Sequence, residues 1–170
     1  MSYIIPYAGV KPQIDGSAQV HGHSTTIIGD VSIAEDSSIW FGAVVRGDVN
    51  YIRIGKRTNI QDNAVIHVTA GGSPTIIGDD VTVGHNAVIH ACKLGDRVLV
   101  GMGTIVMDDV EVADDCLIAA GSLLPPGKKY PKEHLIVGSP AKAVRELTKA
   151  EVDSLKKSAI HYVNVSKSYM

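Results

Sequence analysis

A six-residue repeat of aliphatic side chains runs through most of this chain and restricts its fold more than any other feature. From Ile14 to Leu124, an isoleucine, valine or leucine returns at nearly every sixth position. The eighteen anchors are Ile14, Val20, Ile27, Ile33, Ile39, Val45, Ile54, Ile60, Ile66, Ile77, Val83, Ile89, Leu94, Val100, Val106, Val112, Ile118 and Leu124. A period of six fits neither the 3.6-residue turn of an α-helix nor the two-residue alternation of an ordinary strand. It predicts a parallel β-helix, in which every six residues form one short strand and a corner.

The repeat also predicts how these strands are arranged. Three six-residue units close one triangular coil, so the anchors sort into six coils that begin at Ile14, Ile33, Ile54, Ile77, Leu94 and Val112. Small residues such as Ala43, Ala64 and Ala87 stand four positions after an anchor, where they let a narrow interior fill without voids. Two junctions are longer than six residues, and we expect 49–53 and 68–76 to project from a corner as loops.

Composition supports a strand-rich fold and excludes several classes of protein. The length of 170 residues suits a single domain. The 21 Val and 18 Ile against 8 Leu favour strands. A net charge of -2 argues against nucleic-acid binding, which needs a concentrated basic surface. The chain contains no apolar run of 18 residues and no signal-peptide pattern, so we expect a soluble, cytoplasmic protein without membrane contact.

The C-terminal part reads differently from the repeat. The pattern stops at Pro125, and we expect residues 130–142 to be extended chain that runs back over the coil. A capping box at Thr148 and Glu151, followed by apolar residues at helical spacing, predicts an amphipathic helix to about Ser166. We therefore divide the chain into a β-helix domain with flanking extended chain over 1–142 and a helical segment packed on it over 143–170.

The repeat resembles that of the hexapeptide-repeat proteins. Their fold implies left-handed coiling, an exception to the usual right-handed crossover rule. The fold expected from this resemblance is mainly β, a single-stranded left-handed parallel β-helix of about six coils with a C-terminal α-helix.

Two of the seven histidines fall in one column of the expected prism. His67 and His90 each follow the third anchor of a coil, so they lie one strand spacing apart, or ~4.8 Å. Imidazoles at that spacing can both bind one metal ion through bonds of ~2.0–2.1 Å. Arg46 occupies the position below them. We interpret the remaining histidines outside the motifs as ordinary surface residues: His21, His23, His134 and His161.

His85 belongs to a different wall, because it follows the second anchor of its coil. The residue below it is Asp62, with Gln61 beside that residue. One chain cannot easily bring all three histidines together, but two can if unlike walls of adjacent copies pack against each other. Such a head-to-tail contact must close into a ring or form a filament, and a triangular prism closes as a homotrimer with three interfacial sites. Three neutral imidazoles suit zinc, iron or cobalt and leave a position for water.

The residues around these histidines carry a sharper resemblance. Arg46-Gly47-Asp48, Asn59-Ile60-Gln61-Asp62, His67 and Gly84-His85-x4-His90 resemble the γ-class carbonic anhydrases. The resemblance implies that His67, His85 and His90 bind the metal, with His85 donated by the neighbouring subunit. It also implies interface ion pairs among Arg46, Asp48 and Asp62, with Asn59 beside them and Gln61 bonded to the water on the metal. Tyr162 and Asn164 resemble the tyrosine and asparagine near the metal, although Tyr162 also fits a helix core.

This resemblance predicts reversible hydration of carbon dioxide to bicarbonate. Zinc lowers the pKa of its bound water to about 7, and the hydroxide formed attacks carbon dioxide. The archaeal founder of the family has a long acidic loop with a glutamate proton shuttle. Residues 68–74 occupy that place here without a carboxylate, which predicts low activity unless buffer carries the proton.

Two other functions are compatible with the same fold. Hexapeptide β-helices include acyltransferases that use coenzyme A and a histidine as general base. A non-catalytic protein that binds a metal or siderophore, or that serves as a subunit of a larger assembly, is the third class. Metal content and carbon dioxide hydration together distinguish the three. The physiological metal, the substrate and the turnover are not determined by the sequence.

Overall fold

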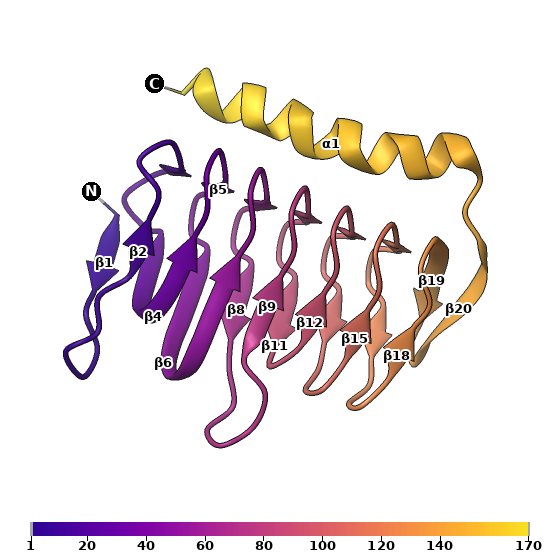
Figure 1. Cartoon of the computed structure of the whole chain (residues 1–170), viewed down its shortest axis with the longest axis horizontal. Helices are drawn as coiled ribbons and strands as arrows, with labels where there is room; N and C mark the ends of the chain where they lie inside the picture. Colours follow the sequence, from indigo (N-terminus) through magenta and orange to yellow (C-terminus); the bar gives the residue numbers. More distant parts are fainter. Residues whose placement is uncertain (1, 170) are drawn as a thin grey trace.

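The computed structural model describes residues 2–169 and has the expected fold class. It is a parallel β-solenoid of about seven turns that matches a left-handed β-helix, with one helix along its side (Figure 1). Wall 1 contains the later parts of β4 (Thr26–Ile33) and β6 (Val44–Ile54), with β2 (Gln13–Ile14), β9 (Thr75–Ile77), β12 (Lys93–Leu94), β15 (Glu111–Val112) and β18 (Lys129–Tyr130). Wall 2 contains β3 (Gln19–Val20), β5 (Ser38–Ile39), β7 (Asn59–Ile60), β10 (Thr82–Val83), β13 (Leu99–Val100), β16 (Leu117–Ile118) and β19 (His134–Gly138).

Wall 3 closes the triangle. It contains β1 (Tyr3–Ile5), the first residues of β4 and β6, β8 (Val65–His67), β11 (Val88–His90), β14 (Ile105–Val106) and β17 (Leu123–Leu124). Parallel pairing stacks each coil on the one before it, so a residue and its counterpart one coil later share a column. Strand β20 (Ala141–Glu146) then returns antiparallel to β19 and leads to helix α1 (Lys149–Lys167).

The aliphatic anchors form the core, as the repeat predicts. Sixteen of the eighteen are buried, and the exceptions are Ile14 and Val20 of the first coil. The small residues four positions after an anchor are buried too, including Ala43, Ala64 and Ala87. A central prism filled by branched aliphatic and small side chains therefore sets the spacing of everything on its surface.

The repeat continues further than the sequence analysis expects. The prediction that residues 130–142 are extended chain running back over the coil was wrong for their first half. Tyr130 and Ile136 follow Leu124 at steps of six, are buried, and pair in parallel with Val112 and Ile118. The tyrosine ring replaces an aliphatic anchor because its hydroxyl donates to the Ala141 carbonyl at 3.1 Å. Only β20 runs back, so the solenoid has an additional turn.

Glycines after the anchors allow coils to stack closely. At Gly78, an added Cβ would lie 2.7 Å from both the carbonyl carbon and the oxygen of Gly95 in the next coil. Both atoms belong to the backbone, so neither moves without shifting the coil. The glycine preference at this position of the repeat therefore reflects the distance between backbones.

Helix α1 lies along wall 2 and begins at the expected capping box (Figure 1). Thr148 and Glu151 exchange side-chain and backbone hydrogen bonds there, while Leu155 and Ala159 are buried against the wall. Among residues 2–169, no helix is both long and apolar enough to cross a membrane.

The last turns of α1 cover His21, which is not the surface residue that the sequence predicts. This side chain is buried, and its Nε2 lies 2.6 Å from Ser166 Oγ. Its ring packs against that of Trp40 at a tilt of 43°, with 4.7 Å between ring centroids. Burial lowers the pKa of His21, although the charge of Asp62 opposes the shift. The neutral imidazole therefore stabilises the docked helix.

We expect Gly78→Ala to destabilise the protein, because its methyl group would displace the Gly95 backbone. The cost should resemble that of other overpacked cores, about 1–3 kcal/mol, and should appear as a lower midpoint of thermal unfolding. Gly16→Ala is the matched control, since nothing lies within 4 Å of a Cβ at Gly16. Equal melting temperatures for the two variants would contradict the stacking argument.

The burial of His21 predicts that acid weakens the protein. The pKa of His21 in the folded chain lies below its unfolded value near 6.5, so protonation favours the unfolded chain. Its contribution to stability is present above that value and is lost as the pH falls below it. We expect His21→Gln to reduce the drop in melting temperature between pH 7.5 and pH 5.5. His161→Gln, on the exposed side of α1, should retain the drop. An unchanged drop in His21→Gln would refute this role.

Candidate metal centre

The predicted histidine column is present on wall 3. His67 and His90 are directly paired in the register between β8 and β11. Val45 pairs with Ile66, which places Arg46 one coil below His67. The prediction that these three residues share one column is therefore confirmed by strand pairing.

A continuous chain of contacts runs through this column. Arg46 Nη1 forms a short ion pair with Asp48, whose other oxygen lies 3.1 Å from His67 Nε2. His67 Nδ1 faces His90 Nε2 at 3.2 Å, and His90 Nδ1 lies 2.7 Å from Asp108 Oδ1. Each ring thus has one nitrogen near a carboxylate, the outer nitrogen (His67 Nε2 and His90 Nδ1). The inner nitrogens, His67 Nδ1 and His90 Nε2, face each other.

Both carboxylates are ionised near neutral pH. Burial raises the pKa of Asp48, but hydrogen bonds from Arg46 and His67 outweigh it, so its pKa lies below the usual 3.8. Burial likewise raises the pKa of Asp108, but hydrogen bonds from Thr69 and His90 lower it by more, so the pKa of Asp108 also lies below its usual value. An ionised carboxylate only accepts hydrogen bonds, so each histidine must donate from its outer nitrogen. The inner nitrogens are left as two lone pairs 3.2 Å apart, which need a proton or a metal cation between them.

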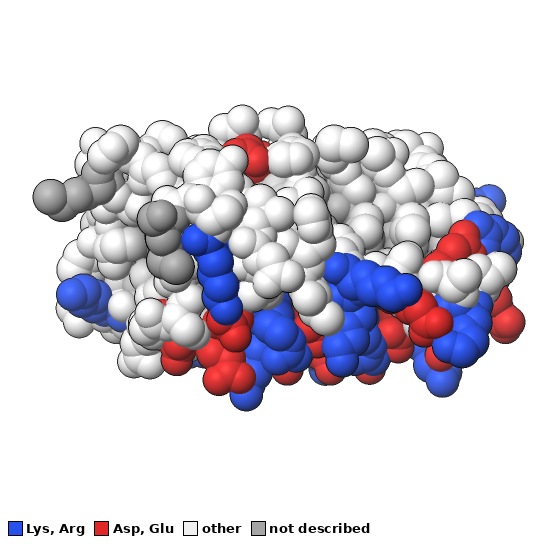
Figure 2. Space-filling view, turned by 90° about the horizontal axis from the view of Figure 1, so that it is seen from above, with Lys and Arg blue, Asp and Glu red and all other residues white. Residues whose placement is uncertain are grey.

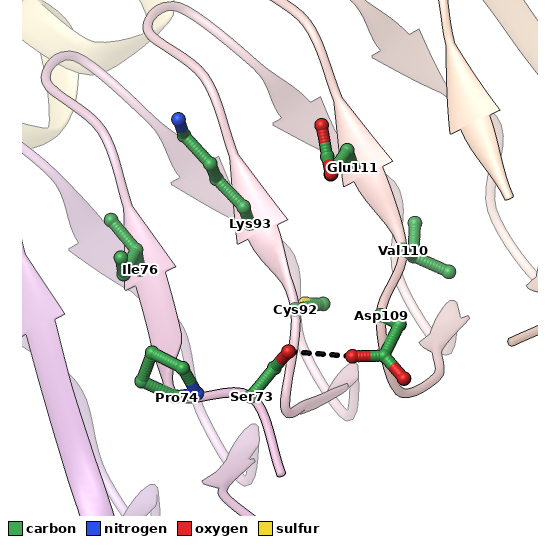
Figure 3. Close-up of a pocket in the computed structure, with 8 residues that line it drawn as sticks. All are labelled: Ser73, Pro74, Ile76, Cys92, Lys93, Asp109, Val110 and Glu111. Carbon is green, nitrogen blue, oxygen red and sulfur yellow. Dashed lines mark hydrogen bonds between the residues drawn. The ribbon is translucent and has the colours of Figure 1, made fainter. Parts of the chain in front are cut away.

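Asp108 is the site residue that the sequence analysis missed. It stands eighteen residues after His90, the length of one coil, and this interval could have identified it. Its Oδ2 accepts a hydrogen bond of 2.5 Å from Thr69 Oγ1 in the loop that follows β8. The same loop is attached to the turn before β15 by Ser73 Oγ, which donates to Asp109 at 2.5 Å beside a hollow of about 210 Å³ (Figure 3). The loop has no carboxylate of its own, but Asp108 lies against it.

His85 lies on another wall, as predicted. It follows β10 on wall 2, and its Nδ1 lies 2.8 Å from Asp62 Oδ2. Among residues 2–169, no three histidine, cysteine or acidic side chains are grouped to hold a metal ion. Within one chain, Asp62 pairs with His85 and Arg46 pairs with Asp48, so Arg46 and Asp62 are not paired with each other. The interface ion pairs expected of these residues involve a second copy and stay a prediction.

A second group of predicted residues surrounds an apolar hollow next to His85. The hollow has a volume of about 280 Å³ and is lined by Gln61, Tyr162, Leu99 and Met102 as well as His85. Buried Gln61 donates from Nε2 to Asn59 Oδ1 at 3.1 Å. Tyr162 also packs edge-to-face on Trp40, with centroids 5.9 Å apart, so it belongs both to the helix packing and to this hollow. Asn164 is exposed and does not line it.

Many charged side chains lie along the edge of the prism where walls 1 and 2 meet. Figure 2 shows mixed Lys, Arg, Asp and Glu side chains along one edge and a nearly uncharged surface beside them. At the corner between walls 1 and 2, Arg57 binds both oxygens of Asp80, and Arg97 binds both of Asp115. Wall 3 instead presents a column of apolar side chains outward: Val44, Val65, Val88, Ile105 and Leu123.

The fold and the histidine column define a hexapeptide-repeat β-helix protein, and family models agree. The "Bacterial transferase hexapeptide (six repeats)" model matches residues 91–126, and the "Hexapeptide repeat of succinyl-transferase" model matches residues 74–107. Among solved structures, a hexapeptide transferase family protein from Anaplasma phagocytophilum has 46% identity and a TM-score of 0.93 over 99% of this chain and 98% of its own. A putative acetyltransferase from Bacillus cereus has 41% identity and a TM-score of 0.95 over 99% and 96%.

Curated relatives identify the branch of the family. A carbonic anhydrase of Geobacillus kaustophilus is 45% identical, with 98% of this chain and 90% of that protein covered. Protein YrdA of Escherichia coli is 46% identical over 97% and 92%. Gamma carbonic anhydrase 2 of Arabidopsis thaliana, a mitochondrial protein, is 46% identical over 85% of this chain, which spans 54% of its length. The chain belongs to the γ-class carbonic anhydrase family of hexapeptide-repeat proteins.

If the histidine column binds zinc, removal of the Asp108 carboxylate should weaken that binding. Asp108→Ala removes the acceptor that orients His90, and loss of such a partner typically costs 10–100-fold in metal affinity. The affinity is measured by competition with a chromogenic chelator. Asp109→Ala is the matched control, because it releases Ser73 and leaves His90 in place. Equal affinities for wild type and Asp108→Ala would exclude this role.

Proposed function

We propose that this protein is a zinc-dependent carbonic anhydrase that interconverts carbon dioxide and bicarbonate at the subunit interfaces of a homotrimer. The observation that carries the proposal is the pair of inner nitrogens of His67 and His90, 3.2 Å apart. Two nitrogens bound to one tetrahedral zinc ion at ~2.0–2.1 Å lie about 3.3 Å apart, close to this separation. The names of the relatives from Geobacillus and Arabidopsis add independent support.

The chemistry of the donors fits zinc, with Fe²⁺ and Co²⁺ as alternatives. Neutral imidazole nitrogens suit all three ions. His67 and His90 would supply two ligands, and His85 of the partner subunit would supply the third. Zinc held by three neutral ligands supplies Lewis acidity that lowers the pKa of a water ligand to about 7.

An exposed apolar column on wall 3 supports the proposed trimer. The apolar column on wall 3 includes Val65 and Ile105, which are 37% and 39% exposed in the single chain. It runs beside the histidines, whereas the charged edge lies at another corner. Packing of wall 3 against the corner of a neighbour that carries His85 would bury this column and assemble three ligands. A head-to-tail contact closes into a ring when its rotation returns to the first copy, and the triangular prism suits a ring of three.

Other residues of the chain have assigned parts in the proposal. Arg46 and Asp48 hold the outer nitrogen of His67, and Asp108 holds that of His90. Gln61 orients the attacking oxygen through its amide oxygen, since its amide nitrogen is bonded to Asn59. Leu99 and Met102 line the hollow and provide an apolar surface for carbon dioxide. Tyr162 borders the hollow, and Asn164 would reach the site only through a neighbouring copy.

Zinc content and carbon dioxide hydration test the proposal together. We expect about one zinc per chain in the wild type, and its loss in His67→Ala, His85→Ala and His90→Ala. His134→Ala, whose imidazole is bonded to the Lys132 carbonyl, should keep both metal and activity. Wild-type protein without metal that binds acetyl coenzyme A tightly would instead establish an acyltransferase. Metal without hydration would establish a binding or assembly protein.

Mixing two inactive variants tests the sharing of the site. His67→Ala and His85→Ala are unfolded together in equal amounts and refolded. In random trimers, one interface in four combines an intact wall 3 with an intact His85, so about a quarter of the zinc and activity should return. Variants refolded separately and then combined without exchange are the control. No recovery from co-refolded trimers would place all ligands within one chain and refute the shared site.

A further inference from the structure

A series of hydrogen bonds between uncharged side chains connects helix α1 to Gln61. Gln61 Nε2 lies 3.1 Å from Asn59 Oδ1, and Asn59 Nδ2 lies 3.0 Å from Thr82 Oγ1. Thr82 Oγ1 lies 3.3 Å from Ser158 Oγ on α1. Asn59, Gln61 and Thr82 are all buried, where an unpaired polar group is costly. These bonds therefore hold Gln61 in one arrangement.

One backbone group fixes the direction of the bonds among Gln61, Asn59 and Thr82. Asn59 Nδ2 also lies 3.3 Å from the carbonyl oxygen of Val81, which can only accept. Asn59 must therefore place its amino group toward Val81 and Thr82, and its carbonyl oxygen toward Gln61. Gln61 must in turn donate from Nε2 to that oxygen. Its own Oε1 makes no hydrogen bond within residues 2–169 and is the acceptor offered to the hollow.

Thr82 completes this polarity because its hydroxyl accepts from Asn59. A hydroxyl that accepts from one neighbour can still donate or accept a second hydrogen bond, and Ser158 Oγ is the partner within reach. The helix thus supplies the final partner in this series of hydrogen bonds. Leu155 and Ala159 on either side of Ser158 are buried, so the position of this serine is fixed by the docking of α1.

We infer that Thr82 and Ser158 are positioning residues that keep Gln61 Oε1 turned toward the hollow as a hydrogen-bond acceptor. The inference rests on the proposed function, because it explains how Gln61 is kept ready to accept a hydrogen bond from the attacking oxygen. A flipped Gln61 would present an amino group there and would repel the same donor. Helix α1 is in this way part of the arrangement of the site.

The test combines side-chain amide exchange with kinetics. The chain has only three glutamines, and Gln13 and Gln19 lie on the surface, so the buried Gln61 amide is identified by its loss in Gln61→Leu. We expect Thr82→Val to speed exchange of the Gln61 amide protons with water about tenfold. The zinc-loaded variant should lose about three- to tenfold in kcat with KM and zinc content unchanged, comparable with the loss of one hydrogen bond. Thr82→Ser should restore both values.

Two serine variants on α1 test the other end of this series of hydrogen bonds. Ser158→Ala should change Gln61 exchange in the same direction as Thr82→Val, although less. Ser154→Ala, an exposed serine one turn earlier that donates to the Glu151 carbonyl, should leave it unchanged. Wild-type exchange and kcat in Thr82→Val would overturn the inference. Faster exchange in a protein that shows no hydration would support the hydrogen-bond chain and overturn the proposed function instead.

Discussion

The stacking of one coil on the next, in parallel and in register, is the constraint on which the rest of the structure depends. Buried anchors fix each coil, and backbone pairing fixes the step between coils at about 4.8 Å. Glycines such as Gly78 allow that step, because a side chain there would meet the backbone above. Side chains on the outside inherit the same spacing. His67 and His90 therefore face each other without any loop or helix having to place them, and a rigid wall maintains their separation.

The candidate centre uses this wall in two directions. Along the column, Asp48 below and Asp108 above take the outer nitrogens of the two histidines, which leaves two lone pairs facing each other. Around the prism, His85 and Gln61 lie at another corner beside α1. One chain carries both halves of the proposed site on different walls, which is why the proposed function requires a neighbour. The loop after β8 is attached to the same centre through Thr69 and Asp108.

Much of the fold could be predicted because the repeat is simple. A period of six predicted the coils, the buried anchors, the column of His67 and His90, and the separate wall of His85. The end of the solenoid could not be predicted in this way. Tyr130 occupies an anchor position although it is not aliphatic, and only the Ala141 carbonyl, brought close by the turn back, satisfies its hydroxyl. His21 was likewise unpredictable, since the helix that covers it is 145 residues away in sequence.

By itself, the sequence determined the periodic part of this protein: its strand-rich composition, its coils and the residues that share a column. These follow from local spacing, which repeats whatever the rest of the chain does. The tertiary structure decided the contacts that the period does not contain. It brought Thr69 of the loop after β8 to Asp108, Ser166 to His21, and Ser158 to the bonds that orient Gln61. The first contact depends on the path of that loop, and the other two depend on where α1 docks; neither property is written in a six-residue period.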